Sequence, residues 1–179
     1  MPKPIFNWQD PLLLDEQLSV TEITMRDQAN TFAQDYLASR VEADFKSGLG
    51  DNNLASAMGK AGLLGTMIPH PSCKGLNNVA YGLICREIER IDSGYRSTLS
   101  VQTSLVMLAI SLFGTDKQKD QYLPLLASGE LLGSFGLTEP NHGSDPSSME
   151  TTATTVTDGY KLNGHKTWIG NAPIADIYI

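Results

Sequence analysis

An arginine followed by two serines is the first group of residues in the sequence whose types and spacing could do chemistry. Arg96, Ser97 and Ser100 lie in residues 87–102, between two apolar segments that are typical of buried helices. If a helix begins near Tyr95, Arg96 and Ser100 stand one turn apart on one face. The planar guanidinium group matches the geometry of a carboxylate, so this face could bind an anion. A solvated arginine near the start of a helix is the alternative interpretation.

A second candidate is the polar segment FGLTEPNHGSDPSS at residues 135–148. Its Pro-Asn pair at 140–141 favours a turn, and Gly143 permits close approach of the backbone. Exposed backbone N–H groups and the hydroxyls of Thr138 and Ser144 could bind a phosphate or the oxygens of a ring. A plain polar turn between strands is the alternative, because such turns are common.

Other kinds of site find little support in the sequence. The three histidines, His70, His142 and His165, are far apart and lack HxxxH or CxxC company, so we predict no metal site. His142, Ser144 and Asp145 lie too close in sequence to align as a catalytic triad, and no GxSxG elbow is present. There is also no GxGxxG motif and no Walker lysine loop.

Helices are predicted for the first two-thirds of the chain, and these elements must position Arg96. Thr115 is expected to cap one helix, with Asp116 adding negative charge to its first turn, and Gly129 to end it. Apolar residues recur at helical spacing in four further segments, residues 21–38, 54–63, 78–91 and 95–113.

Strands are predicted after Glu130, where Thr, Val, Tyr and Trp become frequent. Two hairpin signals lie in this part, an Asp-Gly pair at 158–159 and an Asn-Gly pair at 163–164. Residues 131–139 and 175–179 also fit strands. A sheet of so few strands, with an unpaired edge, is not a comfortable end for a domain, so the chain looks cut short.

These patterns predict an α+β fold with two parts. An all-helical N-terminal domain is expected over residues 1–130, and an incomplete β-domain over residues 131–179. The chain has 179 residues, of which 41% are hydrophobic, enough for a domain with a real core. Charged residues make up only 18%, less than the roughly 25% that is usual. Buried contact with another domain or subunit would explain this deficit.

The charge of the chain excludes several kinds of partner. The net charge is −7 and no basic stripe is present, which argues against nucleic acid and anionic membranes. No apolar run reaches the roughly 18 residues of a membrane span. The first residues resemble neither a signal peptide nor a transit peptide, and Cys73 and Cys85 form no disulfide framework. We therefore expect a cytoplasmic protein.

Several motifs in the sequence resemble a known family. FGLTEPNHGSD at residues 135–145, together with LNGHKTWIGNAPIAD at 162–176, resembles the middle region of the acyl-CoA dehydrogenases, FAD enzymes of thioester oxidation. FNWQDPLLLDEQLS at 6–19, the segment at 79–107 and the segment at 122–154 resemble the glutaryl-CoA dehydrogenase branch in particular. The resemblance covers essentially the whole chain, and its motifs are long and specific.

The resemblance implies a larger fold and a defined reaction. The family has an N-terminal helical domain, a middle β-barrel-like domain and a C-terminal helical bundle, and we expect the bundle to be absent from this chain. FAD lies between the last two domains, and a glutamate of the bundle removes the proton α to the thioester carbonyl. In the glutaryl-CoA branch, loss of CO2 then gives crotonyl-CoA. Electrons leave through electron-transfer flavoprotein, and the complete enzyme is a homotetramer.

The resemblance also assigns FAD-binding residues by position. Thr138 would hydrogen-bond the flavin ring, Ser144 would sit where flavin and CoA meet, and Trp168 would cover the ring from a second strand. Gly170 departs from the family, which commonly has Thr or Ser there, so one hydrogen bond to the flavin is lost, worth about 0.5–1.5 kcal/mol. The full predicted set is Phe135, Gly136, Leu137, Thr138, Glu139, Pro140, Asn141, His142, Gly143, Ser144, Trp168, Ile169 and Gly170.

The same comparison turns Arg96 into a substrate-binding candidate. Arg96, Ser97 and Ser100 match by position the residues that bind the distal carboxylate of a glutaryl group. Glu89 matches an acidic residue of that pocket, although a solvated helix charge fits its mostly polar face equally well. Ser144 would contact the CoA part of the substrate.

The resemblance leaves the chain without a predicted catalytic residue. None of Glu130, Glu139 or Glu150 matches the motif of the family's catalytic glutamate, so we expect a fragment that is inactive alone. Two alternatives remain: a fragment of a general short-chain acyl-CoA dehydrogenase, and a non-catalytic module or half of a split enzyme.

Overall fold

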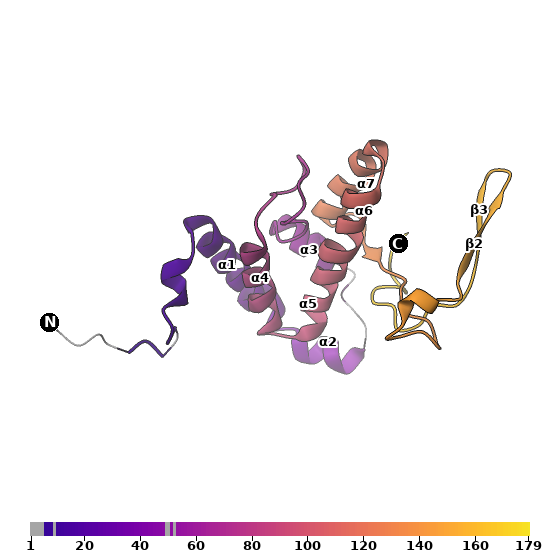
Figure 1. The fold of residues 1–179 in the computed structure, drawn as a ribbon. Helices are drawn as coiled ribbons and strands as arrows, with labels where there is room; N and C mark the ends of the chain where they lie inside the picture. The colour runs from indigo at the N-terminus through magenta and orange to yellow at the C-terminus, as the bar shows by residue number, and fades with distance from the viewer. Residues whose placement is uncertain (1–5, 9, 49–50, 52) are drawn as a thin grey trace. The chain divides into compact units, whose positions relative to one another are not determined.

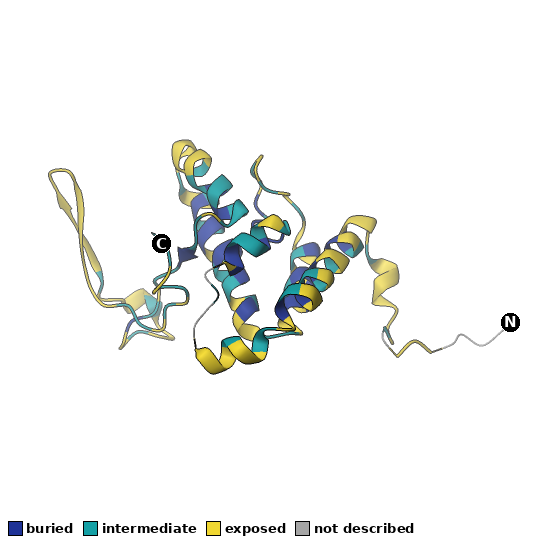
Figure 2. Ribbon diagram, turned by 180° about the vertical axis from the view of Figure 1, so that it is seen from behind, coloured by how far each residue is buried: buried dark blue, intermediate teal, exposed yellow. Residues whose placement is uncertain are grey.

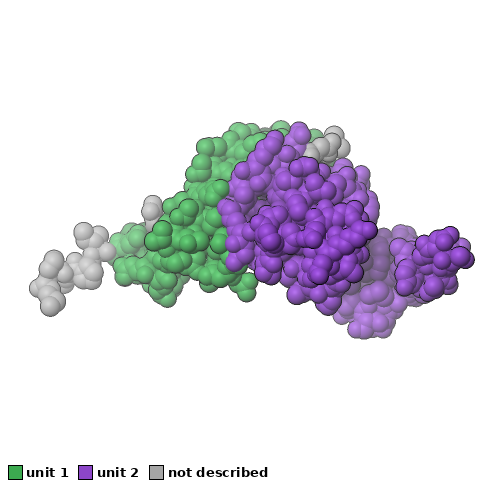
Figure 3. All heavy atoms as spheres, turned by 90° about the horizontal axis from the view of Figure 1, so that it is seen from above, with its two compact units in different colours: residues 1–50, 76–96 green, residues 51–75, 97–179 purple. Residues whose placement is uncertain are grey.

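The computed structural model describes residues 6–8, 10–48, 51 and 53–179 of the chain. It divides into two compact units, drawn in different colours in Figure 3. The first consists of Met1–Gly50 and Leu76–Arg96, and the second of Asp51–Gly75 and Ser97–Ile179.

The first unit is built on two long helices, α1 (Val20–Phe32) and α4 (Asn78–Glu89), which pack against each other (Figure 1). The buried apolar residues of α1, Met25 and Ala29, are four positions apart. The same spacing continues through Ala33 and Leu37 of the π-helix η2 (Ala33–Leu37). The stripe faces α4, whose buried residues are Ala80, Leu83, Ile84, Glu87 and Ile88. A fully buried leucine or isoleucine contributes about 1.5–3 kcal/mol, so this seam holds the unit together.

Helix α1 begins at a capping box that the sequence analysis did not identify. The Ser19 hydroxyl accepts the N–H of Glu22, and the Glu22 carboxylate accepts the N–H of Ser19 at 2.6 Å. Two short elements of this unit were also missed: the 3-10 helix η1 (Leu14–Gln17) and α2 (Val41–Ser47). Neither has a buried residue, so there was no apolar periodicity to reveal it.

A helical stretch runs without a break from Ser93 to Phe113, as α5 (Ser93–Ser100), the π-helix η3 (Val101–Met107) and α6 (Leu108–Phe113). Within the described residues it is long and apolar enough to cross a membrane, by length and composition only. The sequence predicted no such span. Seven residues of the stretch are buried within the chain, as in a core helix: Tyr95, Leu99, Gln102, Thr103, Val106, Met107 and Ile110.

The second unit has its core between η3, α6 and α7 (Asp116–Ser128). Its central residues are Ile68, Val106, Met107, Ile110, Leu123 and Leu126. Helix α7 confirms both predicted ends: Thr115 forms a capping box with Gln118, and Gly129 caps the helix in the left-handed conformation. Gly129 also lets α3 (Leu54–Lys60) come close, because a Cβ there would lie 2.1 Å from the Ala55 carbonyl oxygen.

Four short strands follow, in two separate pairs. Strand β1 (Gly133–Ser134) pairs in parallel with β4 (Ile177–Tyr178), and β2 (Thr152–Val156) pairs antiparallel with β3 (Gly159–Asn163). The β2–β3 hairpin confirms the Asp-Gly signal at 158–159. Every residue of its two strands is exposed, as Figure 2 shows.

Four strand predictions were wrong or too long. Only two residues of 131–139 and two of 175–179 form strands. The Asn-Gly pair at 163–164 starts no second hairpin among the described residues; Gly164 instead allows close packing, since a Cβ there would lie 2.1 Å from Thr151 Oγ1. Trp168 does not lie in a strand, because its φ of 58° is left-handed rather than extended.

Candidate functional site

Arg96 lies on the first turn of α5, at the end of the first unit. Its Nε donates to Glu89 Oε2 at 2.5 Å, and the two side chains are 36% and 45% exposed. The hydrogen bond from Arg96, followed by one from Ser93, lowers the pKa of Glu89, and the same contact raises the pKa of Arg96. Glu89 is therefore the partner of Arg96 rather than a lone solvated charge.

The start of α5 is fixed by a neighbouring aromatic residue. Tyr95 is 8% exposed, and its hydroxyl donates to Asp44 Oδ2 of α2 at 2.6 Å. Burial, helped by the Asp44 carboxylate, raises the pKa of this phenol. Because Tyr95 is anchored, the position of the next residue, Arg96, is also set by the first unit.

The helix that the spacing argument requires is present. Arg96, Ser97 and Ser100 all lie in α5, four positions separating the first from the last. Ser97 is exposed and Ser100 is half-buried, and both belong to the second unit. The carbonyl oxygen of Ser100 accepts the Ser104 hydroxyl at 2.8 Å. The predicted hydroxyls are thus on the expected helix, one turn apart.

The predicted flavin segment at 135–144 contains a tight turn. Glu139 and His142 exchange two backbone hydrogen bonds, each 3.2 Å long, so the chain reverses over Pro140 and Asn141. The residues at 140, 141, 143 and 144 are exposed. Gly143 faces open space, because a Cβ there would meet nothing within 4 Å. The turn therefore offers exposed backbone to a ligand.

The turn is held by a buried carboxylate. Glu139 is 4% exposed, and its oxygens accept the N–H of Glu150 at 2.6 Å, the N–H of Thr151 at 3.0 Å and Lys166 Nζ at 2.9 Å. The Thr151 hydroxyl beside it, then the Glu150 N–H and the Lys166 ammonium, lower the pKa of Glu139 to about 2. Glu139 is therefore ionised at neutral pH.

Lys166 is a functional candidate that the sequence analysis missed. Its ammonium also donates to the Leu137 carbonyl oxygen at 2.9 Å, and the Thr167 N–H donates to the Thr138 carbonyl oxygen at 2.9 Å. The two segments that the sequence assigned to flavin, 135–144 and 168–170, are therefore connected. The sequence separation of 27 residues between Lys166 and Glu139 gave no local signal of this contact.

The second segment presents an exposed tryptophan. Trp168 is 92% exposed, and its neighbour Ile169 is half-buried. The carbonyl oxygen of Gly170 accepts the Ser134 hydroxyl at 2.8 Å, and Asn171 Nδ2 donates to the Gly133 carbonyl oxygen at 3.1 Å. These bonds attach the loop to β1 and leave the indole facing outward.

The glycine at 170 leaves room for a larger side chain. A Cβ at Gly170 would meet only Val101 Cγ2, at an ordinary contact distance of 3.7 Å, and the backbone there is not left-handed. The serine or threonine that the resemblance leads one to expect would therefore fit without rearrangement.

Three potential metal-ligating groups also gather at the turn, which the histidine spacing did not predict. Ligand atoms of Glu139, His142 and Glu150 lie within 4.8 Å of one another. His142 Nε2 is 3.5 Å from Glu150 Oε1, an ion pair only when the imidazole is protonated. The Lys166 ammonium already neutralises Glu139, so this cluster is better satisfied as a salt-bridged turn than as a cation site.

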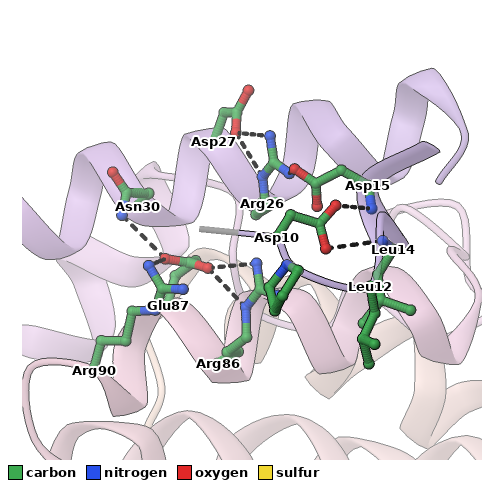
Figure 4. Close-up of a pocket in the computed structure, with 11 residues that line it drawn as sticks. Asp10, Leu12, Leu14, Asp15, Arg26, Asp27, Asn30, Arg86, Glu87 and Arg90 are labelled. Atoms are coloured by element: carbon green, nitrogen blue, oxygen red, sulfur yellow. Dashed lines mark hydrogen bonds and ion pairs between the residues drawn. The ribbon is translucent and has the colours of Figure 1, made fainter. Parts of the chain in front are cut away.

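A separate polar pocket of about 590 Å³ lies in the first unit, and no predicted site residue lines it (Figure 4). At its floor, Glu87 is 2% exposed and pairs with Arg86 at 2.9 Å and Arg90 at 3.3 Å. Arg26 pairs with Asp15 at 2.6 Å. Each of these three guanidinium groups already has a carboxylate, so the pocket wall is a structural charge network.

Two models of known protein families match the chain. The family model for the acyl-CoA dehydrogenase N-terminal domain matches residues 19–130, and the model for the acyl-CoA dehydrogenase middle domain matches residues 134–179. The chain belongs to the acyl-CoA dehydrogenase family. The recognition made from the motifs and the expected α+β fold, a helical part followed by a partial sheet, are confirmed.

Several acyl-CoA dehydrogenases resemble the chain along most of its length. An acyl-CoA dehydrogenase of Bacillus subtilis (strain 168) is 41% identical over 159 residues, which are 88% of this chain and 42% of that protein. A glutaryl-CoA dehydrogenase from Mycobacterium smegmatis in complex with FADH2 has a TM-score of 0.89 and 41% identity, covering 92% of this chain and 42% of that one. Butyryl-CoA dehydrogenase from Megasphaera elsdenii has a TM-score of 0.83 and 36% identity, with coverages of 90% and 44%.

The acyl-CoA dehydrogenase relatives are longer than this chain. The chain spans 42% of the length of the B. subtilis protein that it matches. The relatives include enzymes described for glutaryl-CoA and for butyryl-CoA, so membership of the family does not by itself select the acyl group.

Proposed function

We propose that this chain is part of an FAD-dependent acyl-CoA dehydrogenase whose substrate is glutaryl-CoA, oxidised and decarboxylated to crotonyl-CoA and CO2. It would supply the N-terminal helical domain, residues 1–130, and the start of the middle domain, residues 131–179. The observation that supports the substrate is Arg96, a half-exposed guanidinium group that already holds a carboxylate at 2.5 Å. The family supplies the reaction type.

The residues at the turn fit FAD. The exposed residues at 140, 141, 143 and 144, the open space at Gly143 and the exposed indole of Trp168 form the kind of surface that can bind an anionic cofactor with a flat ring system. When bound, FAD would supply the acceptor for the hydride removed from the substrate. The Thr138 hydroxyl would donate to the ring, and Trp168 would cover the ring and exclude water.

Arg96 would select a dicarboxylyl group by exchange of carboxylates. In the chain alone, Glu89 occupies the guanidinium. The distal carboxylate of a glutaryl group carries the same charge and a similar geometry, so it can take that place, and the displaced Glu89 side chain, which is 45% exposed, is then solvated by water. Ser97 and Ser100 would add hydroxyl donors from the same helix, and Ser144 would contact the CoA moiety.

The described carboxylates near the turn do not suit the role of catalytic base. Glu139 has a pKa of about 2, and a base that weak accepts a proton from carbon poorly at neutral pH. Glu130 and Glu150 do not match the family motif. We infer that the base comes from outside residues 1–179, and that a cytoplasmic homotetramer would pass electrons to electron-transfer flavoprotein.

A short-chain acyl-CoA dehydrogenase is the second candidate. Glu89 neutralises Arg96 in the chain, and a neutral pair at the end of a pocket would suit an uncharged acyl tail such as butyryl. A non-catalytic module, or half of a split enzyme, is the candidate of a different class.

The test compares two substrates in the protein as its gene encodes it, with any partner chain present. Arg96→Ala should lower kcat/KM for glutaryl-CoA about tenfold to a hundredfold more than for butyryl-CoA, the size of one charge-assisted hydrogen bond. Equal losses on both substrates would reject the role in selecting glutaryl-CoA. Purified residues 1–179 should show no glutaryl-CoA-dependent dye reduction, and measurable turnover would show that the base is within them.

A further inference from the structure

Glu139 is placed where a ligand-binding residue was expected but is bonded like a structural one. Its side chain is only 3% exposed, while the neighbouring residue Pro140 is exposed. A buried carboxylate is costly unless it is fully paired. Glu139 is paired by two backbone N–H groups, of Glu150 and Thr151, and by the Lys166 ammonium.

Glu139 and its partners lie on three separate stretches of chain. The Glu139–His142 turn is one, the residues that lead into β2 are the second, and the stretch that carries Lys166 and Trp168 is the third. Lys166 reinforces the link by donating to the Leu137 carbonyl oxygen at 2.9 Å. One carboxylate thus connects both segments proposed to line the flavin.

The same bonds argue against direct contact between Glu139 and FAD. Its oxygens accept three donors from within the protein, and a free carboxylate facing the anionic diphosphate of FAD would repel it. Lys166 is likewise used by the protein, and its side chain is 23% exposed. Neither group has the exposure or the free bonding capacity of the Gly143 backbone or Trp168.

We propose that Glu139 and Lys166 form a positioning pair, which sets the distance between the turn at 139–142 and the Trp168 loop so that FAD fits between them. This inference rests on the proposed FAD-dependent function. The sequence assigned Glu139 as a residue that contacts the cofactor. In this proposal Glu139 instead holds in place the segments that contact it.

The test is a double-mutant cycle on FAD affinity, in the protein as its gene encodes it. Glu139→Gln and Lys166→Met should each weaken FAD binding about tenfold to a hundredfold, as loss of a supporting contact does at other sites. The double variant should bind FAD as well as the single variant with the lower FAD affinity, because either change breaks the same link. Lys166→Arg, which keeps the charge, should retain more affinity than Lys166→Met.

Matched controls separate the link from charge alone. Lys161→Met removes an exposed lysine of β3, and Glu42→Gln neutralises a carboxylate of α2 that is 79% exposed. Both should bind FAD like the wild type. A structural readout should agree: in Glu139→Gln, hydrogen exchange at the amides of Glu150 and Thr151 should accelerate while the amides of α7 keep their protection.

Three outcomes overturn the inference. One is unchanged FAD affinity in Lys166→Met, which decides the matter even if Glu139→Gln does not fold. The second is a double variant whose loss is the product of the two single losses, since that shows two independent effects. The third is a wild-type protein that takes up no FAD; it removes the proposed function as well, and it is recognised before any substitution is made.

Discussion

The turn at 139–142 and the first turn of α5 both use a glutamate paired with a cation, but they differ in burial. The Glu139 side chain is 3% exposed and accepts three donors. The Glu89 side chain is 45% exposed, and that of its partner Arg96 is 36% exposed. Buried pairs are hard to break because a lone charge would remain, and exposed pairs exchange easily with other ions. The comparison suggests a prebuilt cofactor wall and an exchangeable substrate contact.

The tight packing around the turn gives the largest expected effect. Gly164→Ala would place a Cβ 2.1 Å from Thr151 Oγ1, and such overpacking costs about 1–3 kcal/mol. Gly143→Ala changes a residue near the same turn that faces open space, so it should change the free energy of unfolding by less than about 0.5 kcal/mol. Urea denaturation of the two variants measures the contrast, and equal stabilities would argue that the turn is loosely packed.

Acid should break the turn without breaking the helices. The pKa of Glu139 is lowered from its ordinary value of 4.5 to about 2. Its contribution to stability is therefore complete above about pH 4.5 and is lost as the pH falls toward 2. Hydrogen exchange at the Glu150 and Thr151 amides should rise over that window in the wild type. In Glu139→Gln the rise should be absent; an identical rise would assign it to another group.

Removing the exchangeable partner should sharpen the substrate preference. Glu89→Gln leaves Arg96 without its carboxylate, so the ratio of kcat/KM for glutaryl-CoA over butyryl-CoA should increase by a few-fold, the scale of an exposed ion pair. The unfolding midpoint should not change. A fall in the ratio would instead give Glu89 a direct part in holding the substrate.

The smallest effect is expected at position 170. Gly170→Ser adds a side chain into space whose nearest atom is 3.7 Å away, so stability should stay within about 0.5 kcal/mol of the wild type. FAD affinity should rise modestly if the hydroxyl reaches the flavin. A marked loss of stability would contradict the open surroundings of Gly170.

Local signals in the sequence predicted much of the helical part. The Thr115 cap and the glycine at 129 set both ends of α7 correctly, because capping depends on residues within one turn. The Asp-Gly pair at 158–159 gave the β2–β3 hairpin for the same reason. Helix α2 was missed because its seven residues are too few to show a repeated apolar pattern.

Features that depend on distant residues could not be predicted. Glu139 and Lys166 are 27 positions apart, and nothing near either one indicates the pair. The strand expected around Trp168 failed because two hydrogen bonds to β1, rather than local β propensity, shape the loop: the Ser134 hydroxyl donates to the Gly170 carbonyl oxygen, and Asn171 Nδ2 donates to the Gly133 carbonyl oxygen. The proposed cofactor and substrate residues were therefore assigned by motif, while the contacts around them required the structure.

The contrast between the two glutamate pairs is tested most directly by two variants measured side by side, Lys166→Met and Arg96→Lys. FAD affinity and the glutaryl-CoA to butyryl-CoA ratio of kcat/KM are determined for each in the protein as its gene encodes it. Lys166→Met should weaken FAD binding and leave the substrate ratio unchanged, and Arg96→Lys should lower the ratio and leave FAD binding unchanged. If both variants change the same quantity, the division into a prebuilt cofactor wall and an exchangeable substrate contact is wrong.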